Sequence, residues 1–328
     1  MFARGFDCGP IAAPDGCDMN FQDRVQDRIQ GGLIGLLVGD ALGVPYEFHD
    51  PQDIPELALI EFEPPPGFAR AHKGTPPGTW SDDGAQALCL LASLQHHHKL
   101  EPQDLAHRFV NWYEHGYLAV DARVFDVGIQ TAKSIRAIQA GVPALQAGSS
   151  DRYSQGNGSL MRVLPLALWH QGSDADLVRA AHDQSKVTHG HRVCLVCCAL
   201  YCLWARRMLE EHTNPWDAAL EALRVIYGTQ PEFLAVLEDV IRHEAQREPR
   251  GTGFVIDCLY SAKWALEQGD FEAVVRAAIS LGNDTDTTAC VAGGLAGIRD
   301  GLEGIPIRWR DALRGQELLV PMIQGLSK

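Results

Sequence analysis

Apolar residues recur along most of the chain at the 3.6-residue spacing of amphipathic helices, and the alternating runs typical of strands are scarce. The first helical segment, residues 23–42, has an apolar face formed by Val25, Ile29, Leu33 and Leu36. It is followed by Gly43 and Pro45, which favour a helix end. The same spacing predicts helices over residues 82–97, 102–114, 127–140, 160–170, 174–184, 191–211, 216–227, 231–247, 254–267, 271–281, 287–298 and 307–315.

This pattern predicts an all-α fold, because it lacks the strand–helix alternation of Rossmann and barrel folds. No fixed-period repeat and no linker-like shift in composition divides the chain. We therefore expect a single helical domain over residues 21–328, preceded by a flexible Gly-, Pro- and Asp-containing tail, residues 1–20. The Pro- and Gly-rich connection over residues 51–77 is longer than a simple turn between helices requires, which indicates a role of its own.

Composition is that of an ordinary globular protein, with 46% apolar and 21% charged residues among 328. The net charge is −14, from 28 basic and 42 acidic residues. Such an acidic surface repels a nucleic-acid backbone, which is bound through Lys and Arg, and it suits a protein that holds cations.

Nine cysteines cannot all pair with one another. Four of them, Cys194, Cys197, Cys198 and Cys202, lie in an apolar helical run, where we interpret them as small core residues. A zinc site is the alternative, but a second pair or suitably spaced histidines are missing. Unpaired thiols favour a reducing, cytoplasmic location. We find no uncharged apolar stretch of 18 residues and no secretory signal, so we expect no membrane segment.

Two segments carry more oxygen-bearing side chains than a helix start requires. Residues 80–84 (WSDDG) precede one apolar run, and residues 282–288 (GNDTDTT) precede another. Helix capping is the simpler interpretation of either segment alone. Capping uses one oxygen per helix, however, whereas each segment offers two carboxylates and a hydroxyl. The surplus suits a hard divalent cation such as Mg²⁺ or Mn²⁺.

Three further positions could contact a ligand. Glu47 follows the first helix on a loop, between Tyr46 and Phe48, whose burial would hold it in place. Residues 156–162 (GNGSLMR) are expected to open the helix over 160–170, and a helix N-terminus can bind phosphate, although an ordinary helix start is the simpler view. His189 lies in a break between helices, where it can contact a ligand or merely cap.

Five segments in this order resemble the ADP-ribosylglycohydrolase family: residues 39–48 (GDALGVPYEF), 81–83 (SDD), 156–162 (GNGSLMR), 185–190 (SKVTHG) and 282–287 (GNDTDT). The resemblance extends over residues 25–309. It departs from the family at Ser81, where Thr is most frequent, and at Gly84, where Thr is common. A serine hydroxyl can still ligate a metal ion. The resemblance implies an all-α orthogonal bundle with two Mg²⁺ or Mn²⁺ ions at the base of an ADP-ribose cleft.

The resemblance also implies roles for individual residues. The implied metal ligands are Ser81, Asp82, Asp83, Asp284, Asp286 and Thr287. Glu47 would belong to a flap over the metal ions, and Asp126 would be a further acid on the substrate side. The implied substrate contacts are Gly156, Asn157, Gly158 and Ser159 for the pyrophosphate, His189 for the distal ribose, and Thr252, Gly253 and Phe254 for the adenosine end.

These residues predict a metal-dependent hydrolase that removes ADP-ribose from a protein side chain, with arginine favoured over serine. Glu47 is the expected general acid or base, since glycosidic cleavage needs a carboxylate near the anomeric carbon, and Asp83 is the next candidate. The alternative is a module that binds ADP-ribose, or an ADP-ribosyltransferase, without turnover. A third hypothesis makes residues 1–20 an arm for a partner transferase. We expect the connection over residues 51–77 to form part of the rim that meets the modified side chain.

Overall fold

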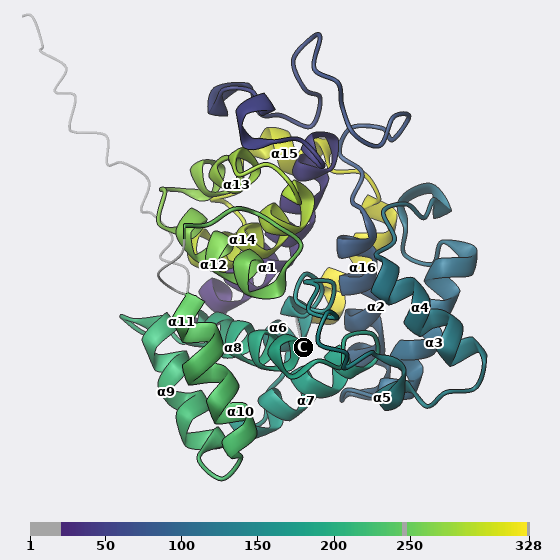
Figure 1. The fold of residues 1–328 in the computed structure, drawn as a ribbon. Helices are drawn as coiled ribbons and strands as arrows, with labels where there is room; N and C mark the ends of the chain where they lie inside the picture. Colours follow the sequence, from purple (N-terminus) through teal and green to yellow (C-terminus); the bar gives the residue numbers. More distant parts are fainter. Residues whose placement is uncertain (1–20, 245–247, 327–328) are drawn as a thin grey trace, which may run out of the picture.

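A computed structural model describes residues 21–244 and 248–326 (Figure 1). Within these ranges the fold is all-α, as predicted, and it contains two isolated bridges but no strand. The α-helices are α1 Phe21–Gly43, α2 Asp82–His97, α3 Pro102–His115, α4 Ile129–Gln139, α5 Ala144–Ala147, α6 Leu164–Trp169, α7 Asp174–Lys186, α8 Arg192–Leu209, α9 Pro215–Tyr227, α10 Pro231–Ala235, α11 Arg242–Glu244, α12 Val255–Leu266, α13 Phe271–Ser280, α14 Thr285–Asp300, α15 Ile307–Ala312 and α16 Gln316–Leu326.

Helices α1 and α14, from opposite ends of the chain, lie side by side at the centre (Figure 1). Glycines repeat every four residues along the face of α1 that meets α14. A Cβ atom at Gly35 would lie 2.3 Å from the carbonyl oxygen of Gly293, and one at Gly39 would lie 2.1 Å from that of Ala289. Because neither position has room for a side chain, the two backbones touch. This contact places the C-terminal end of α1 against the N-terminal end of α14.

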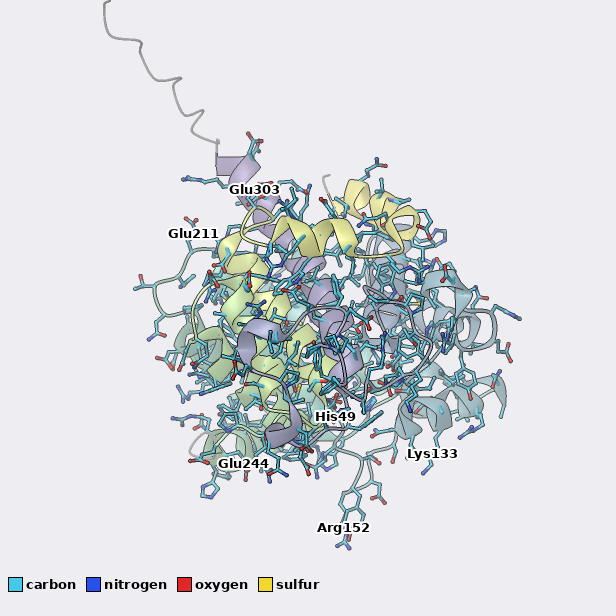
Figure 2. All side chains as sticks on the ribbon, turned by 90° about the horizontal axis from the view of Figure 1, so that it is seen from above. His49, Lys133, Arg152, Glu211, Glu244 and Glu303 are labelled. Carbon is cyan, nitrogen blue, oxygen red and sulfur yellow. The ribbon has the colours of Figure 1, made fainter. Side chains whose placement is uncertain are left out.

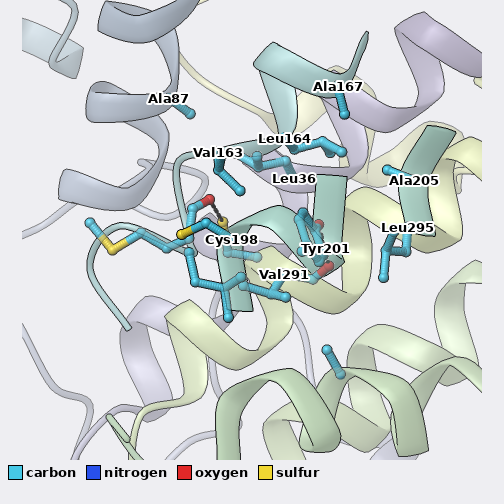
Figure 3. Packing of buried hydrophobic residues seen from close by; sticks show 14 of the residues in the cluster. Leu36, Ala87, Val163, Leu164, Ala167, Cys198, Tyr201, Ala205, Val291 and Leu295 are labelled. Carbon is cyan, nitrogen blue, oxygen red and sulfur yellow. Dashed lines mark hydrogen bonds between the residues drawn. The ribbon is translucent and has the colours of Figure 1, made fainter. Parts of the chain in front are cut away.

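The core around this pair is filled by α6 and α8. Leu36 of α1 packs near Leu164 of α6, Tyr201 of α8 and Val291 of α14 (Figure 3). The Tyr201 hydroxyl donates a hydrogen bond of 2.9 Å to the carbonyl oxygen of Val291, which satisfies the polar group of a fully buried side chain. The four cysteines of α8 are buried and unpaired, as expected for small core residues.

One segment, Gln22–Tyr46, is long and apolar enough to cross a membrane, which the search for uncharged runs missed. In the fold it is the central helix α1 with its following turn, and 89% of its most apolar 18-residue window is buried inside the protein. Its apolar character is therefore accounted for by packing against the other helices.

Several boundaries differ from the sequence-based expectation. The helix expected from residue 160 begins at Leu164, and residues 157–162 form turns. The helix expected from residue 287 begins at Thr285, which brings two more polar residues into its first turn. Helix α16 was not predicted, and the expected helix over residues 231–247 contains a π-helical segment at Val236–Ile241. The tail proposed for residues 1–20 lies outside the described residues.

Candidate active site

A cleft of about 730 Å³ opens between α2, α4, the turns before α6 and the start of α14. One end, here called the acidic end, is lined by Glu47, Asp82, Asp83, Asp126, Asp284 and Thr287. The other, the turn end, is lined by Gly156, Asn157, Gly158 and His189. Lys133 and Tyr153 line the cleft farther out. Lys133 and Arg152 project outward at the same edge of the molecule (Figure 2). The cleft therefore brings together predicted residues from distant segments.

The start of α2 is held by a carboxylate that the sequence analysis did not single out. Asp40, fully buried on α1, accepts hydrogen bonds from the N–H groups of Ser81 (2.9 Å) and Gly84 (2.8 Å). The Ser81 hydroxyl accepts from the N–H of Asp83, so it caps α2 as the simpler interpretation held. A charged residue inside the apolar helix 23–42 was the signal that could have marked Asp40.

The first turns of α2 and α14 face each other across the acidic end. The Thr287 hydroxyl lies 3.4 Å from Oδ1 of Asp83, and the Thr287 N–H donates to Oδ1 of Asp286. The second oxygen of each carboxylate, Oδ2 of Asp83 and Oδ2 of Asp286, is buried and has no hydrogen-bond partner among the described residues. Buried carboxylate oxygens are normally paired, so these two indicate that a positively charged partner belongs here.

Glu47 completes this end of the cleft. One carboxylate oxygen each of Glu47, Asp284 and Asp286 lies within 4.8 Å of the others. Glu47 is 5% exposed, and the loop that carries it is tied to the start of α14 because the Phe48 N–H donates to the carbonyl oxygen of Asn283 (2.7 Å). Tyr46 is buried as expected, but the expected burial of Phe48 is wrong: its side chain is 71% exposed.

His72 is a second residue that the sequence analysis missed. It comes from the connection over residues 51–77, and its Nε2 lies 2.5 Å from Oε2 of Glu47 and 3.9 Å from Oδ1 of Asp126. Its ring packs against that of Phe125 at a tilt of 56°, with 5.1 Å between the ring centroids. The long connection therefore reaches the acidic end and contacts its carboxylates. No local pattern marked His72, because a loop position carries no periodicity.

Burial of so many acids in one place shifts their proton affinities. Burial, followed by the neighbouring carboxylates, raises the pKa of Glu47 to about 11. Burial likewise raises the pKa of Asp126 to about 6, and it raises the pKa values of Asp82, Asp83 and Asp286 well above the usual range. None of the described Lys or Arg side chains forms an ion pair with any of these groups, and the residue that pairs with Glu47 and Asp126 is His72, whose pKa burial lowers.

These residues fit a divalent cation of the Mg²⁺ or Mn²⁺ type. Such ions take carboxylate, hydroxyl and water oxygens, which are the atoms that converge here. The residues with free or weakly held oxygens are Asp83 and Asp286, while Asp284 accepts from the Asn157 side chain at 2.8 Å. A bound cation would neutralise the carboxylates, which burial otherwise keeps in the protonated form.

The turn end is built differently from the predicted helix start. Residues 157–162 form tight turns, in which the N–H groups of Leu160 and Met161 both donate to the carbonyl oxygen of Asn157. In the described part of the chain, the backbone N–H groups of Gly158 and Ser159 have no acceptor. Successive free N–H groups at a turn can bind an anion, although the helix N-terminus expected here is absent.

The remaining predicted substrate contacts occupy different positions. The hydroxyl of Ser159 is bonded to that of Ser185 in the core (2.8 Å), so its side chain does not face the cleft. Phe254 pairs with Gly156 in an isolated bridge, and the Thr252 side chain donates to Asp257. The segment 252–254 therefore supports the turn from outside and is not among the residues that line the cleft.

Comparison with known proteins finds relatives over most of the chain. The chain is 28% identical over 291 residues to the ADP-ribosylarginine hydrolase Tri1 of Pseudomonas putida, covering 88% of this chain and 75% of that protein. It is 26% identical over 280 residues to the ADP-ribosyl-[dinitrogen reductase] glycohydrolase of Rhodospirillum rubrum, covering 84% and 86%. It is 26% identical over 335 residues to human ADP-ribosylhydrolase ARH3, covering 89% and 90%.

A solved structure described as an ADP-ribosylglycohydrolase-related protein complex superposes with a TM-score of 0.74 at 32% identity, covering 93% of this chain and 98% of that one. The profile of the ADP-ribosylglycohydrolase family matches residues 22–327, which include all the segments that carried the resemblance. The chain therefore belongs to the ADP-ribosylglycohydrolase family.

Proposed function

We propose that this protein is a divalent-metal-dependent hydrolase that cleaves the bond between ADP-ribose and a modified protein side chain. The observation that carries the proposal is the acidic end of the cleft, where Glu47, Asp284 and Asp286 converge within 4.8 Å and two buried carboxylate oxygens have no partner in the described ranges. A module that only bound ADP-ribose would gain nothing from so costly a cluster.

The two ends of the cleft suit the two parts of this substrate. The free N–H group of Gly158 would hold the pyrophosphate at the turn end, and the acidic end would receive the distal ribose with its glycosidic bond. When bound, a pair of Mg²⁺ or Mn²⁺ ions supplies Lewis-acid chemistry that orients a water molecule and lowers its pKa. Water adds its oxygen to the anomeric carbon and gives up one proton, the bond to the side chain breaks, and the departing atom takes a proton.

Glu47 is the residue that we assign to proton transfer. It is buried beside the cluster, and His72 fixes its carboxyl group through the 2.5 Å contact at Nε2. A carboxyl group that moves a proton at the scissile bond must hold one orientation, which this contact provides. Among the other acids that line the same end, Asp83 and Asp126 are the alternative candidates for this role.

We propose arginine as the modified side chain, since the Tri1 proteins of Pseudomonas putida and Serratia proteamaculans are named ADP-ribosylarginine hydrolases. To test the proposal, arginine-linked and serine-linked ADP-ribosyl peptides are incubated with the protein and Mg²⁺, Mn²⁺ or EDTA, and free ADP-ribose is measured. We expect release from the arginine peptide with either ion and none with EDTA. Release from the serine peptide alone would show that the modified side chain is serine and not arginine. Tight ADP-ribose binding without release from either peptide would favour the binding module.

A further inference from the structure

Arg162 is a charged side chain buried in the core behind the cleft. It is fully inaccessible to solvent, and its guanidinium lies 4.5 Å from the centre of the Phe109 ring. Burial lowers its pKa only to about 10, so it stays charged at neutral pH. All its hydrogen bonds to described residues go to neutral oxygen atoms. Because burying a charge without a counter-ion is costly, this arrangement calls for a reason beyond packing.

One arm of its hydrogen bonds leads to the acidic end. Nη1 of Arg162 donates to Oε1 of Gln86 (2.8 Å), and Nε2 of Gln86 donates to Oδ2 of Asp82 (2.7 Å). A guanidinium can only donate, so the amide oxygen of Gln86 must face Arg162 and its NH₂ group must face Asp82. The arm therefore fixes the carboxylate plane of Asp82, which lines the cleft.

A second arm leads to the turn end. Nη2 of Arg162 donates to Oγ1 of Thr188 (2.8 Å), which lies 2.7 Å from Nδ1 of His189. Since the hydroxyl oxygen accepts from Arg162, its hydrogen is free to donate to Nδ1. His189 is thereby held as the neutral tautomer with its proton on Nε2. That nitrogen borders the turn, because a Cβ atom added at Gly158 would lie 3.1 Å from it.

We propose that Arg162 is a positioning residue that sets both ends of the cleft at once. Through Gln86 it orients Asp82 toward a divalent cation, and through Thr188 it makes His189 an N–H donor toward an oxygen atom of ADP-ribose. The inference rests on the proposed function, because it assigns the two ligands to the two ends. It adds that one buried charge serves both.

Single-arm variants separate this role from a general contribution to the core. Gln86→Met keeps the length of the side chain and removes its hydrogen bonds, and Thr188→Val keeps the shape and removes the hydroxyl. Ser93→Ala, a buried polar position on α2 outside both arms, is the matched control. Calorimetry measures the affinity for Mn²⁺ alone, and then the affinity for ADP-ribose at saturating Mn²⁺.

We expect Gln86→Met to weaken Mn²⁺ binding by about 10–100-fold, as loss of a residue behind a metal ligand does, and to change ADP-ribose affinity by less than about threefold. Thr188→Val should weaken ADP-ribose binding by about 3–10-fold and leave Mn²⁺ affinity unchanged. Arg162→Met should weaken both, and adding Gln86→Met to it should cost no further Mn²⁺ affinity. The proposal is wrong if Gln86→Met leaves the Mn²⁺ affinity unchanged and Thr188→Val leaves the ADP-ribose affinity unchanged. It is also wrong if both variants weaken the binding of the two ligands to the same extent.

The tautomer of His189 can be measured in the protein without any ligand. In ¹⁵N-labelled protein, the ring nitrogen shifts should show a protonated Nε2 in the wild type and a mixture of tautomers in Thr188→Val. A mixture already present in the wild type would overturn the histidine arm. If the wild type bound neither Mn²⁺ nor ADP-ribose, the proposed function would fail, whereas the tautomer would still decide the positioning role.

Discussion

At the acidic end of the cleft, carboxylates outnumber their partners among the described residues, whereas around the buried Arg162, behind the cleft, the side-chain donors and their acceptors are matched. Asp83 and Asp286 each keep a buried oxygen unbonded. The Arg162 guanidinium instead reaches Gln86, Gln184, Thr188 and Gly158. Both regions are buried and polar, so burial alone does not distinguish them.

The difference lies in where the compensating charge comes from. The surroundings of Arg162 are completed by the protein itself, since their cation is a side chain. The acidic end is left incomplete, and its charge is balanced only by protonation or by a cation from solution. We therefore expect changes at the acidic end to act on chemistry and metal binding, and changes at the turn end to act on substrate affinity.

The largest effect should come from Glu47→Gln. Gln keeps the size of the side chain but cannot transfer a proton, so turnover should fall by about 10²–10⁴, while ADP-ribose affinity changes little. Initial rates on an ADP-ribosyl-arginine peptide, paired with calorimetry at saturating Mg²⁺, measure the two quantities. A variant that turns over at the wild-type rate would transfer the role to Asp83 or Asp126.

Asp286→Ala should reduce turnover by at least about 10²–10³, the usual effect of removing a positioned electrostatic group. The same change relieves repulsion with Glu47 and Asp126, so the metal-free variant should unfold at a urea concentration no lower than the wild type does. Rates and urea midpoints are measured on one preparation. Activity within about fivefold of the wild type would exclude Asp286 as a metal ligand.

Removing the divalent cation should destabilise the wild type. A ligand present at a hundred times its dissociation constant stabilises by about 2.7 kcal/mol, which corresponds to roughly 4 °C in melting temperature for a domain of about 300 residues. Thermal scans with Mn²⁺ and with EDTA should show this difference in the wild type and in Thr188→Val, but not in Asp286→Ala. An equal shift in all three proteins would place the cation elsewhere.

The smallest effect is an opposite response to pH at the two ends. Burial raises the pKa of Asp126 to about 6, so without metal its contribution to stability is present near pH 4 and is lost as the pH rises through 6. Burial lowers the pKa of His189 to about 3, so stability is lost as the pH falls below 6.5.

His189→Gln should therefore gain stability relative to the wild type as the pH falls from 7 to 5, by at most about 1.4 kcal/mol per pH unit. Urea denaturation in EDTA at several pH values measures this difference. Parallel curves for the two proteins would show that His189 titrates alike in the folded and unfolded states.

The all-α fold and the pairs of aspartates could be predicted from sequence, because helical periodicity and surplus oxygens at helix starts are local patterns. Asp40 could not be assigned its role, since its partner Ser81 is 41 positions away. His72 lies in an irregular loop and meets Glu47 only through the fold.

The misplaced helix start has a physical reason. Leu160, Met161 and Val163 are apolar at helical spacing, but they fill the core from a turn. Helix α16 escaped prediction because it follows Gly315 and contains Pro321, both of which favour a break. In this segment the sequence pattern predicts that the side chains are buried, but it does not predict that a turn, and not a helix, carries them.

The backbone contact between α1 and α14 also bears on how the protein is made. The two helices are separated by more than 240 residues of chain, and the acidic end takes Glu47 from the loop after α1 and Thr287 from α14. During synthesis, α1 leaves the ribosome long before its partner exists, with an apolar glycine-lined face and nothing to cover it. The cleft can thus be completed only after nearly the whole chain has emerged, and folding must close a long loop. Until then, the apolar face of α1 stays exposed on the nascent chain.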